Sequence, residues 1–122
     1  MFPKMNLGET NPQRCRSNYG EGRYFMPTYI TLGKWTQKGF EKVKESAVRL
    51  DAFKKVIQSS GGKLKDFYMV MGQYDMVIIT EAPDDESVAK TMLTSGSKGN
   101  VSTMTFRAFT EEEYRKIMAA LP

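Results

Sequence analysis

The period of apolar and polar positions changes several times after residue 26, and each change marks the boundary of an expected element. Residues 28–35 (TYITLGKW) alternate, which predicts a strand with Ile30 and Leu32 on the side covered by helices. Thr36 then caps a predicted helix that ends at the glycines of SSGGK, where Gly61 or Gly62 can adopt a left-handed conformation. The apolar stripe of this helix consists of Phe40, Val43, Ala47, Leu50, Phe53 and Ile57.

The second half of the chain repeats the alternation of strands and helices. The segments KLKDFYMVM and YDMVIITEA predict two strands joined at Gly72 as a hairpin. Pro83 suits the first turn of a second helix with an acidic start, and VSTMTFRAF predicts a fourth strand. Thr110 and Glu113 have the spacing of a capping box, which predicts a last short helix. The apolar residues of that helix are Tyr114, Ile117, Met118 and Leu121.

This order, β-α-β-β-α-β with an extra C-terminal helix, predicts an α+β fold of the ferredoxin-like type, in which both main helices lie on one face of an antiparallel sheet. The chain has 122 residues, enough for one domain with a substantial core. We place the domain at residues 26–122. Residues 1–25 are rich in Asn, Gly, Pro and Arg and show no periodicity, so we expect a disordered extension; the alternative is a functional basic arm.

The central strands are apolar at consecutive positions, in MVII and in DFYMVM. Such strands present hydrophobic side chains on both faces of a sheet, and the helices can cover only one face. An apolar face left open on a small soluble domain is rare. The pattern therefore predicts a homodimer, or a higher homo-oligomer, in which two sheets pack face to face.

Composition narrows the chemistry that this chain can perform. Cys15 is the only cysteine and histidine is absent, which excludes intramolecular disulfides, histidine-based triads and the usual metal sites. The net charge is +4, but lysines and arginines alternate with acidic residues along the helices, as on solvated surfaces. No apolar run approaches the roughly 18 residues of a membrane span. We expect a cytoplasmic protein with no cofactor or metal that binds neither nucleic acid nor membrane.

The motif Gly-x-Tyr-Asp, formed by Gly72, Tyr74 and Asp75, is the first candidate site. Gly72 can supply a positive φ, Asp75 can accept hydrogen bonds from turn amides, and Tyr74 can cover the end of the hairpin. The alternative makes Tyr74 and Asp75 a proton-transfer or ligand-orienting pair, the only catalytic candidates in the chain. The structural interpretation is favoured because no nucleophile accompanies the pair.

The second candidate site follows from the alternation within the outer strands. If Ile30 and Leu32 face the helices, the intervening side chains face away from them and suit a small anionic or aromatic ligand. The predicted ligand-binding residues are Tyr29, Thr31, Trp35, Thr103, Thr105 and Arg107. The interpretation that this surface forms the dimer interface and its rim is favoured over a pocket, and one surface can serve both purposes.

The chain resembles the GYD-domain family, small bacterial proteins named for a Gly-Tyr-Asp motif. The stretches that carry the resemblance are PTYITLGKWTQKG, GGKLKDFYMVMGQYD, EAPDDESVAK and GNVSTMTFRAFTEEEYRKI, which together span residues 26–122. The resemblance implies a ferredoxin-like domain of the dimeric α/β-barrel type and no established activity. A proline expected after Ser46 is Ala47 in this chain, which leaves open whether the long helix is broken near Ser46.

A similar Gly-x-Tyr-Asp turn occurs in the effector-binding domains of leucine-responsive and asparagine-type bacterial regulators, where small metabolites bind at subunit interfaces. Together these features favour a non-catalytic or weakly catalytic oligomeric module whose sheet face forms the subunit interface, with room for a small-molecule pocket at the same interface. The alternative is a cofactor-independent oxygenase or isomerase of the dimeric α/β-barrel type. That alternative requires Tyr74, Asp75 or Arg107 to line a closed cavity.

Overall fold

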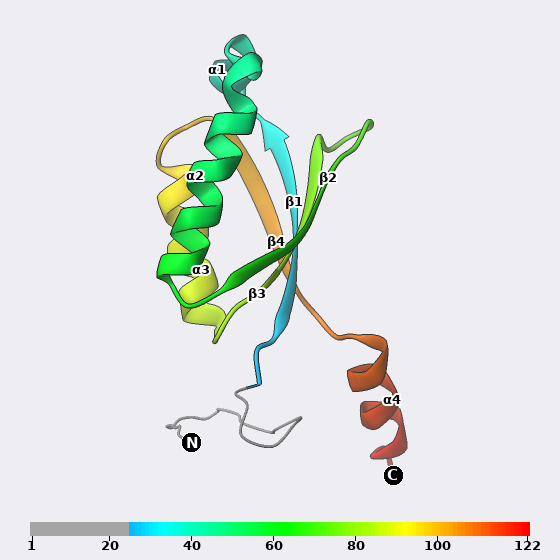
Figure 1. The fold of residues 1–122 in the computed structure, drawn as a ribbon. Helices are drawn as coiled ribbons and strands as arrows, with labels where there is room; N and C mark the ends of the chain where they lie inside the picture. Colours follow the sequence, from blue (N-terminus) through cyan, green and yellow to red (C-terminus); the bar gives the residue numbers. More distant parts are fainter. Residues whose placement is uncertain (1–24) are drawn as a thin grey trace.

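The computed structural model describes residues 25–122, so the predicted extension lies, apart from Phe25, outside the described residues. Figure 1 shows the sheet with α2 and α3 along one side and α4 beyond its end. The elements are β1 (Thr28–Trp35), α1 (Gln37–Glu41), the 3₁₀ turn η1 (Val43–Glu45), α2 (Ser46–Ser59), β2 (Lys63–Met69), β3 (Met76–Glu81), α3 (Asp85–Gly96), β4 (Val101–Ala108) and α4 (Glu111–Ala119).

The sheet has the strand order β2-β3-β1-β4, and every neighbouring pair is antiparallel. β1 lies in the interior of the sheet, where Ile30 is opposite Ile79 of β3 and Phe106 of β4. Both crossover helices pack on the same face, α2 after β1 and α3 after β3 (Figure 1). The predicted ferredoxin-like fold is confirmed.

The helix predicted after Thr36 is divided into three pieces. Thr36 caps α1 as predicted, and its Oγ1 accepts a hydrogen bond from the Gly39 amide at 3.1 Å. The backbone leaves the helical region at Lys42, where φ is −119° and ψ is 41°, and α2 begins at Ser46. Arg49 donates to the carbonyl oxygens of Gly39 and Lys42 at 3.1 and 3.2 Å, which ties α2 to the residues before the break, and the Lys42 carbonyl also accepts from the Glu45 amide at 2.9 Å. The predicted long helix is therefore interrupted before Ser46, although Ala47 stands where a proline was expected.

The second main helix starts later than predicted. Asp84 is the N-cap of α3, and its Oδ1 accepts a hydrogen bond from the Ser87 amide at 2.8 Å. Pro83 precedes this cap, so its predicted place in the first helical turn is wrong. Asp85 and Glu86 lie in the first turn, where their negative charges favour the positive end of the helix dipole.

The core lies between the sheet and the two helices α2 and α3. Tyr29, Ala82 and Val88 form a buried cluster against which Met92 packs. Ile57 of α2 and Ile78 of β3 are also buried. Burying an aliphatic side chain of this size contributes roughly 1.5–3 kcal/mol, so a small number of such contacts fixes the helices on this face.

Candidate functional site

The face of the sheet that α2 and α3 leave uncovered carries a continuous set of apolar side chains. Tyr29 packs with the α3 residue Val88, so alternation along β1 turns Ile30 and Leu32 to the opposite face. The pairing register then places the partners of these two residues on that same face. We call this surface the open face, and it consists of Ile30, Leu32, Tyr68, Val77, Ile79, Met104 and Phe106.

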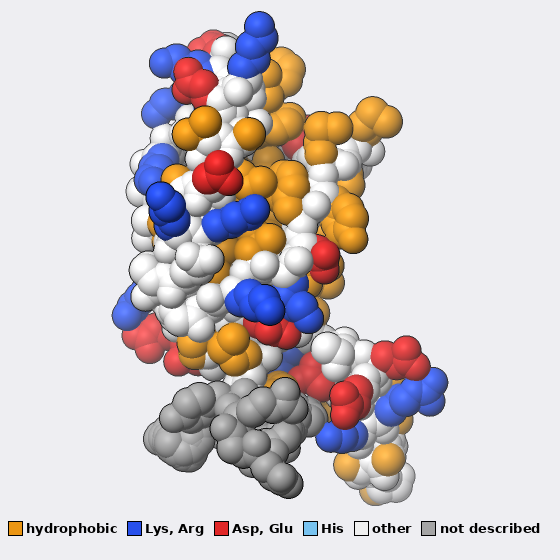
Figure 2. Space-filling view, in the orientation of Figure 1, with side chains coloured by type: hydrophobic (Ala, Val, Ile, Leu, Met, Phe, Trp, Pro, Cys, Tyr) orange, Lys and Arg blue, Asp and Glu red, His pale blue; other side chains and the backbone are white. Residues whose placement is uncertain are grey.

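The open face is accessible over most of its width. Tyr68, Met104 and Phe106 are 56%, 48% and 46% exposed, and the residues between them are partly exposed. Figure 2 shows hydrophobic side chains along the side of the molecule that faces away from α2 and α3. An apolar surface of this kind marks a site of interaction more often than an ordinary solvated surface.

The predicted assignment of the two faces is wrong. Ile30 and Leu32 were expected to point at the helices, but Tyr29, Thr31 and Gly33 occupy that side. The reason is packing: Tyr29 is buried in one cluster with Val88 of α3, which turns the alternate residues of β1 to the helices. Gly33 suits that side, because a Cβ atom there would lie 2.7 Å from Cγ of Met76 and would displace that side chain. The prediction from the sequence therefore put the open-face residues on the wrong side of the sheet. The small and hydroxyl-bearing residues at alternate positions of β1 could have indicated the side on which the helices pack closely.

The predicted ligand-binding residues share one side of the sheet, and it is the side that the helices cover. Thr31 is 0% exposed, and its hydroxyl hydrogen-bonds that of Thr105 at 2.9 Å. The ring centroid of Trp35 lies 6.3 Å from that of Phe40 in α1. Thr103 is exposed at the outer strand. Apart from Thr103, these residues are partly or fully buried on the helix-covered side, and their ligand binding stays a prediction.

Tyr29 and Arg107 connect four elements, β1, β4, α3 and α4, at the end of the sheet where β1 begins and β4 ends. The Tyr29 hydroxyl donates a hydrogen bond to Asp85 at the start of α3. Arg107 lies 6.0 Å from the centroid of the Tyr29 ring and 3.7 Å from the Glu113 carboxylate. Burial raises the pKa of the Tyr29 phenol above its usual range, and the hydrogen bond and negative charge of Asp85 raise it further, while Arg107 lowers it. Tyr29 is therefore a neutral donor that connects β1 to α3.

The Gly-x-Tyr-Asp turn connects the hairpin to the end of β1. Gly72 has φ +144°, a conformation that side chains other than glycine rarely adopt. Asp75 Oδ2 accepts from the Trp35 amide at 2.9 Å, so the predicted acceptance from turn amides is replaced by a bond to a different strand. The Tyr74 hydroxyl lies over the open face, 3.9 Å from Sδ of Met104. These contacts account for the motif by its role in the fold.

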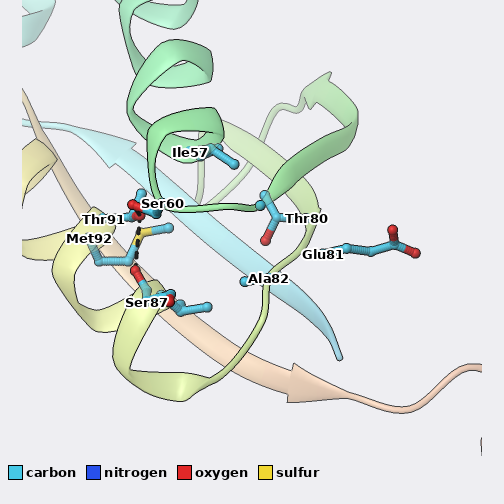
Figure 3. Close-up of a pocket in the computed structure, with 10 residues that line it drawn as sticks. Ile57, Ser60, Thr80, Glu81, Ala82, Ser87, Thr91 and Met92 are labelled. Carbon is cyan, nitrogen blue, oxygen red and sulfur yellow. Dashed lines mark hydrogen bonds between the residues drawn. The ribbon is translucent and has the colours of Figure 1, made fainter. Parts of the chain in front are cut away.

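A small cavity lies among α2, β3 and α3 (Figure 3). Ile57, Thr80 and Met92 form part of its wall, and the hydroxyls of Ser60 and Thr91 lie 3.4 Å apart at its edge. It offers about 10 Å³, about the room that one water molecule needs. A metabolite requires several hundred Å³, and none of the predicted site residues lines this space.

Neither a metal site nor a membrane span is found in the described part of the chain. Within residues 25–122, no group of three His, Cys, Asp or Glu side chains could hold a metal ion. The helices of the same range are all too short or too polar to cross a bilayer.

Comparison with known sequences gives a family and a named relative. The GYD domain model matches residues 29–118. A Thermus thermophilus protein named glutamine synthetase and cystathionine beta-lyase binding protein is 36% identical over 84 residues, which is 68% of this chain and 88% of the relative.

Comparison with solved structures supports the fold. Ribosomal protein S6 of Thermotoga maritima superposes with a TM-score of 0.53 at 15% identity, covering 78% of this chain and 99% of the ribosomal protein. MtbAldR superposes with a TM-score of 0.51 at 13% identity, covering 69% of this chain and 52% of MtbAldR, so this chain spans about half the length of that protein. Identities this low carry information about fold alone. The match to residues 29–118, together with the relative from Thermus, shows that this chain belongs to the GYD domain family.

Proposed function

We propose that this chain is a protein-binding module that assembles with itself through the open face and has no catalytic step of its own. The observation that carries the proposal is the exposure of Tyr68, Met104 and Phe106 on a sheet whose other side is already packed. Soluble monomers rarely leave large apolar patches in water, because covering them releases roughly 25 cal/mol for each Å² buried.

The named relative supports a second part of the proposal, that the module also binds an enzyme. The name of the Thermus protein states that it binds glutamine synthetase and cystathionine beta-lyase. By this likeness we propose that a glutamine synthetase or a cystathionine beta-lyase is the partner of this chain. A cytoplasmic setting, which is part of the same proposal, fits a chain with one cysteine.

Self-assembly is tested by light scattering coupled to size-exclusion chromatography. We expect the parent chain to have at least twice the mass of a single chain, and Phe106→Asp to shift it toward the monomer because a charge would be buried between apolar faces. Val48→Asp is the matched control, since Val48 is 71% exposed on α2, far from the open face. A monomeric parent, or equal effects of the two substitutions, would contradict assembly through this face.

Enzyme binding is tested separately with purified proteins. The immobilised chain is exposed to the glutamine synthetase and to the cystathionine beta-lyase of its own source, and saturable binding of at least one enzyme is expected in surface plasmon resonance. Val48→Asp should bind as the parent does if α2 is outside the binding surface. Binding of neither enzyme would remove this part of the proposal and leave self-assembly standing.

Small-molecule binding between subunits is a second proposal, favoured by the position of Tyr74. The Tyr74 hydroxyl donates to the Met104 sulfur, a weak acceptor, at 3.9 Å. A stronger acceptor on a ligand would replace the sulfur as the partner of this hydroxyl. A metabolite enclosed between two open faces would meet this phenol. A thermal-shift screen of free amino acids should then give a stabilisation that Tyr74→Phe abolishes, and a screen without any stabilising compound would argue against the site.

A further inference from the structure

The C-terminal helix α4 carries an apolar stripe that the described chain leaves exposed. Tyr114, Ile117 and Met118 recur at spacings of three and four, so they share one side of the helix. Leu121, which the sequence places in the same helix, follows the C-terminal cap Ala120 and extends the apolar stripe beyond the last turn. The exposed fractions of these four apolar residues are 54%, 41%, 45% and 58%. Because α4 has only nine residues, it is too short to be stable in water by itself and needs a surface to pack on.

The first turn of α4 fixes the direction in which the helix points. Thr110 Oγ1 accepts from the Glu113 amide at 3.2 Å, and Glu113 Oε1 accepts from the Thr110 amide at 2.8 Å, which completes the predicted capping box. The Glu113 carboxylate also lies 3.7 Å from Arg107 of β4 and is only 8% exposed. Arg107 in turn lies 4.4 Å from the centroid of the Phe109 ring. These contacts tie the start of α4 to the end of β4.

The connection is too short and too well anchored for α4 to cover its own sheet. β4 ends at Ala108 and α4 begins at Glu111, so Phe109 and Thr110 are the whole link. Figure 1 shows α4 beyond the end of the sheet, on the side away from α2 and α3. To reach the open face of the same chain, α4 would have to reverse its direction and break the contact between Arg107 and Glu113.

The charged side of α4 is already paired within the helix. Arg115 lies 2.8 Å from Glu111, and Lys116 lies 3.8 Å from Glu112, both at the i,i+4 spacing. Such exposed pairs contribute only a few tenths of a kcal/mol, but they leave the charged side suited to water. The apolar stripe is then the side on which α4 can dock.

We infer that α4 docks its apolar stripe on the open face of a second copy of this chain, an inference that rests on the proposed self-assembly. A second copy fits because α4 follows β4 after two residues, close to Phe106 at the edge of the open face, and because both surfaces are apolar and exposed. When two open faces meet about a two-fold axis, a helix held beyond the end of one sheet reaches the other subunit, and symmetry doubles the contact. The added surface helps the interface approach the roughly 800 Å² per subunit of stable complexes.

Photo-cross-linking with isotope mixing tests which surface α4 contacts. A photoreactive phenylalanine analogue replaces Met118 in a ¹⁴N-labelled chain, which is mixed with ¹⁵N-labelled parent chain and irradiated. We expect mixed-isotope cross-links from residue 118 to residues 64–69, 76–81 or 101–108. A cross-link within one chain only, or to residues 1–24 of either chain, would overturn the inference.

A pair of charge substitutions gives an independent measurement. Ile117→Glu introduces a charge into the stripe, whereas Ala119→Glu places the same charge on the opposite side of the same helix. Ile117→Glu should raise the dissociation constant of the dimer about tenfold or more, and Ala119→Glu should leave it within about threefold. An unchanged constant for Ile117→Glu overturns the docking of α4, and if Phe106→Asp still separates the subunits the proposed assembly survives. A monomeric parent overturns both.

Discussion

The two faces of the sheet use opposite kinds of residue for opposite tasks. The face covered by α2 and α3 includes Thr31 and Thr80, which are 0% and 3% exposed, and Gly33, which lies beneath Met76. The open face presents aliphatic and aromatic side chains, and Phe106 is still 46% exposed. Within one chain, the more apolar face is therefore the less protected one. This difference is the one expected if the second face is covered in an assembly, as we propose, since the chain's own helices cover only the first.

Hydrogen bonding explains how a polar face can be buried. Thr31 and Thr105 satisfy each other through their hydroxyls at 2.9 Å, and Tyr29 donates to Asp85. A buried hydroxyl without a partner would cost about 1–3 kcal/mol, so these pairs allow the helices to close over the sheet. The side chains of the open face are mostly aliphatic or aromatic, so removing this face from water breaks few hydrogen bonds and costs little free energy.

The largest expected difference in stability is between substitutions of Ile78 and Ile79, two adjacent residues of β3 that face opposite sides of the sheet. Ile78→Ala should lower the free energy of unfolding by about 2–5 kcal/mol, because Ile78 is 4% exposed beneath the helices. Ile79→Ala, on the open face, should lower it by about 1 kcal/mol or less in the Phe106→Asp background, where assembly is expected to be absent. Urea unfolding measures both. Equal losses would show that the two faces are equally buried within one chain.

The next largest loss of stability is expected from the hydroxyl pair Thr31 and Thr105 on the covered face. Thr105→Val removes the partner of Thr31, which is 0% exposed, and should cost about 1–3 kcal/mol. Thr31→Val should cost less, because Thr105 as a residue is partly exposed, so we expect its hydroxyl to bind water instead. The double substitution should cost less than the sum of the single ones. Additive losses in urea unfolding would mean that the two hydroxyls act independently.

The elements of this fold were predictable because each has its own period or cap. The capping box at Thr110 and Glu113 and the N-cap at Thr36 follow from residue types a few positions apart. Which alternate residues of β1 face the helices was not predictable in the same way. Alternation allows two orientations, and a shift of one residue exchanges the faces; the packing of Tyr29 on Val88 decides between them.

The candidate site was predictable only where its contacts are local. The turn at Gly72 is visible in the sequence, since a positive φ is expected of glycine in a tight connection. The acceptor role of Asp75 involves the amide of Trp35, 40 residues away, and no local pattern indicates such a partner. The stripe of α4 was visible, but its exposure follows from the anchoring of Glu113 by Arg107.

A smaller effect is expected at the turn that holds the hairpin over the open face. A Cβ atom at Gly72 or at Gly96 would meet nothing within 4 Å, but of these two only Gly72 has a positive φ, of +144°. Gly72→Ala should therefore cost about 1–2 kcal/mol through the backbone alone. Gly96→Ala, at the end of α3, should be neutral or stabilising by up to about 1 kcal/mol. Thermal unfolding compares them, and equal stabilities would contradict a turn that requires glycine.

The smallest expected difference in stability is between substitutions of Tyr29, which lies under the helices, and Tyr68, which lies on the open face. Tyr29→Phe removes the hydrogen bond to Asp85 and should cost about 0.5–1.5 kcal/mol near neutral pH. Because burial raises the Tyr29 pKa in the folded state, its contribution is complete below the unfolded pKa of about 10 and declines as the pH rises toward the folded value. The difference between the parent and Tyr29→Phe in urea unfolding should thus be constant from about pH 7 to about pH 9 and shrink above about pH 10. Tyr68→Phe is the control, since Tyr68 is 56% exposed in a single chain, and it should cost less than Tyr29→Phe near neutral pH. A Tyr29→Phe chain that lost stability in alkali as steeply as the parent would show that this phenol does not connect β1 to α3.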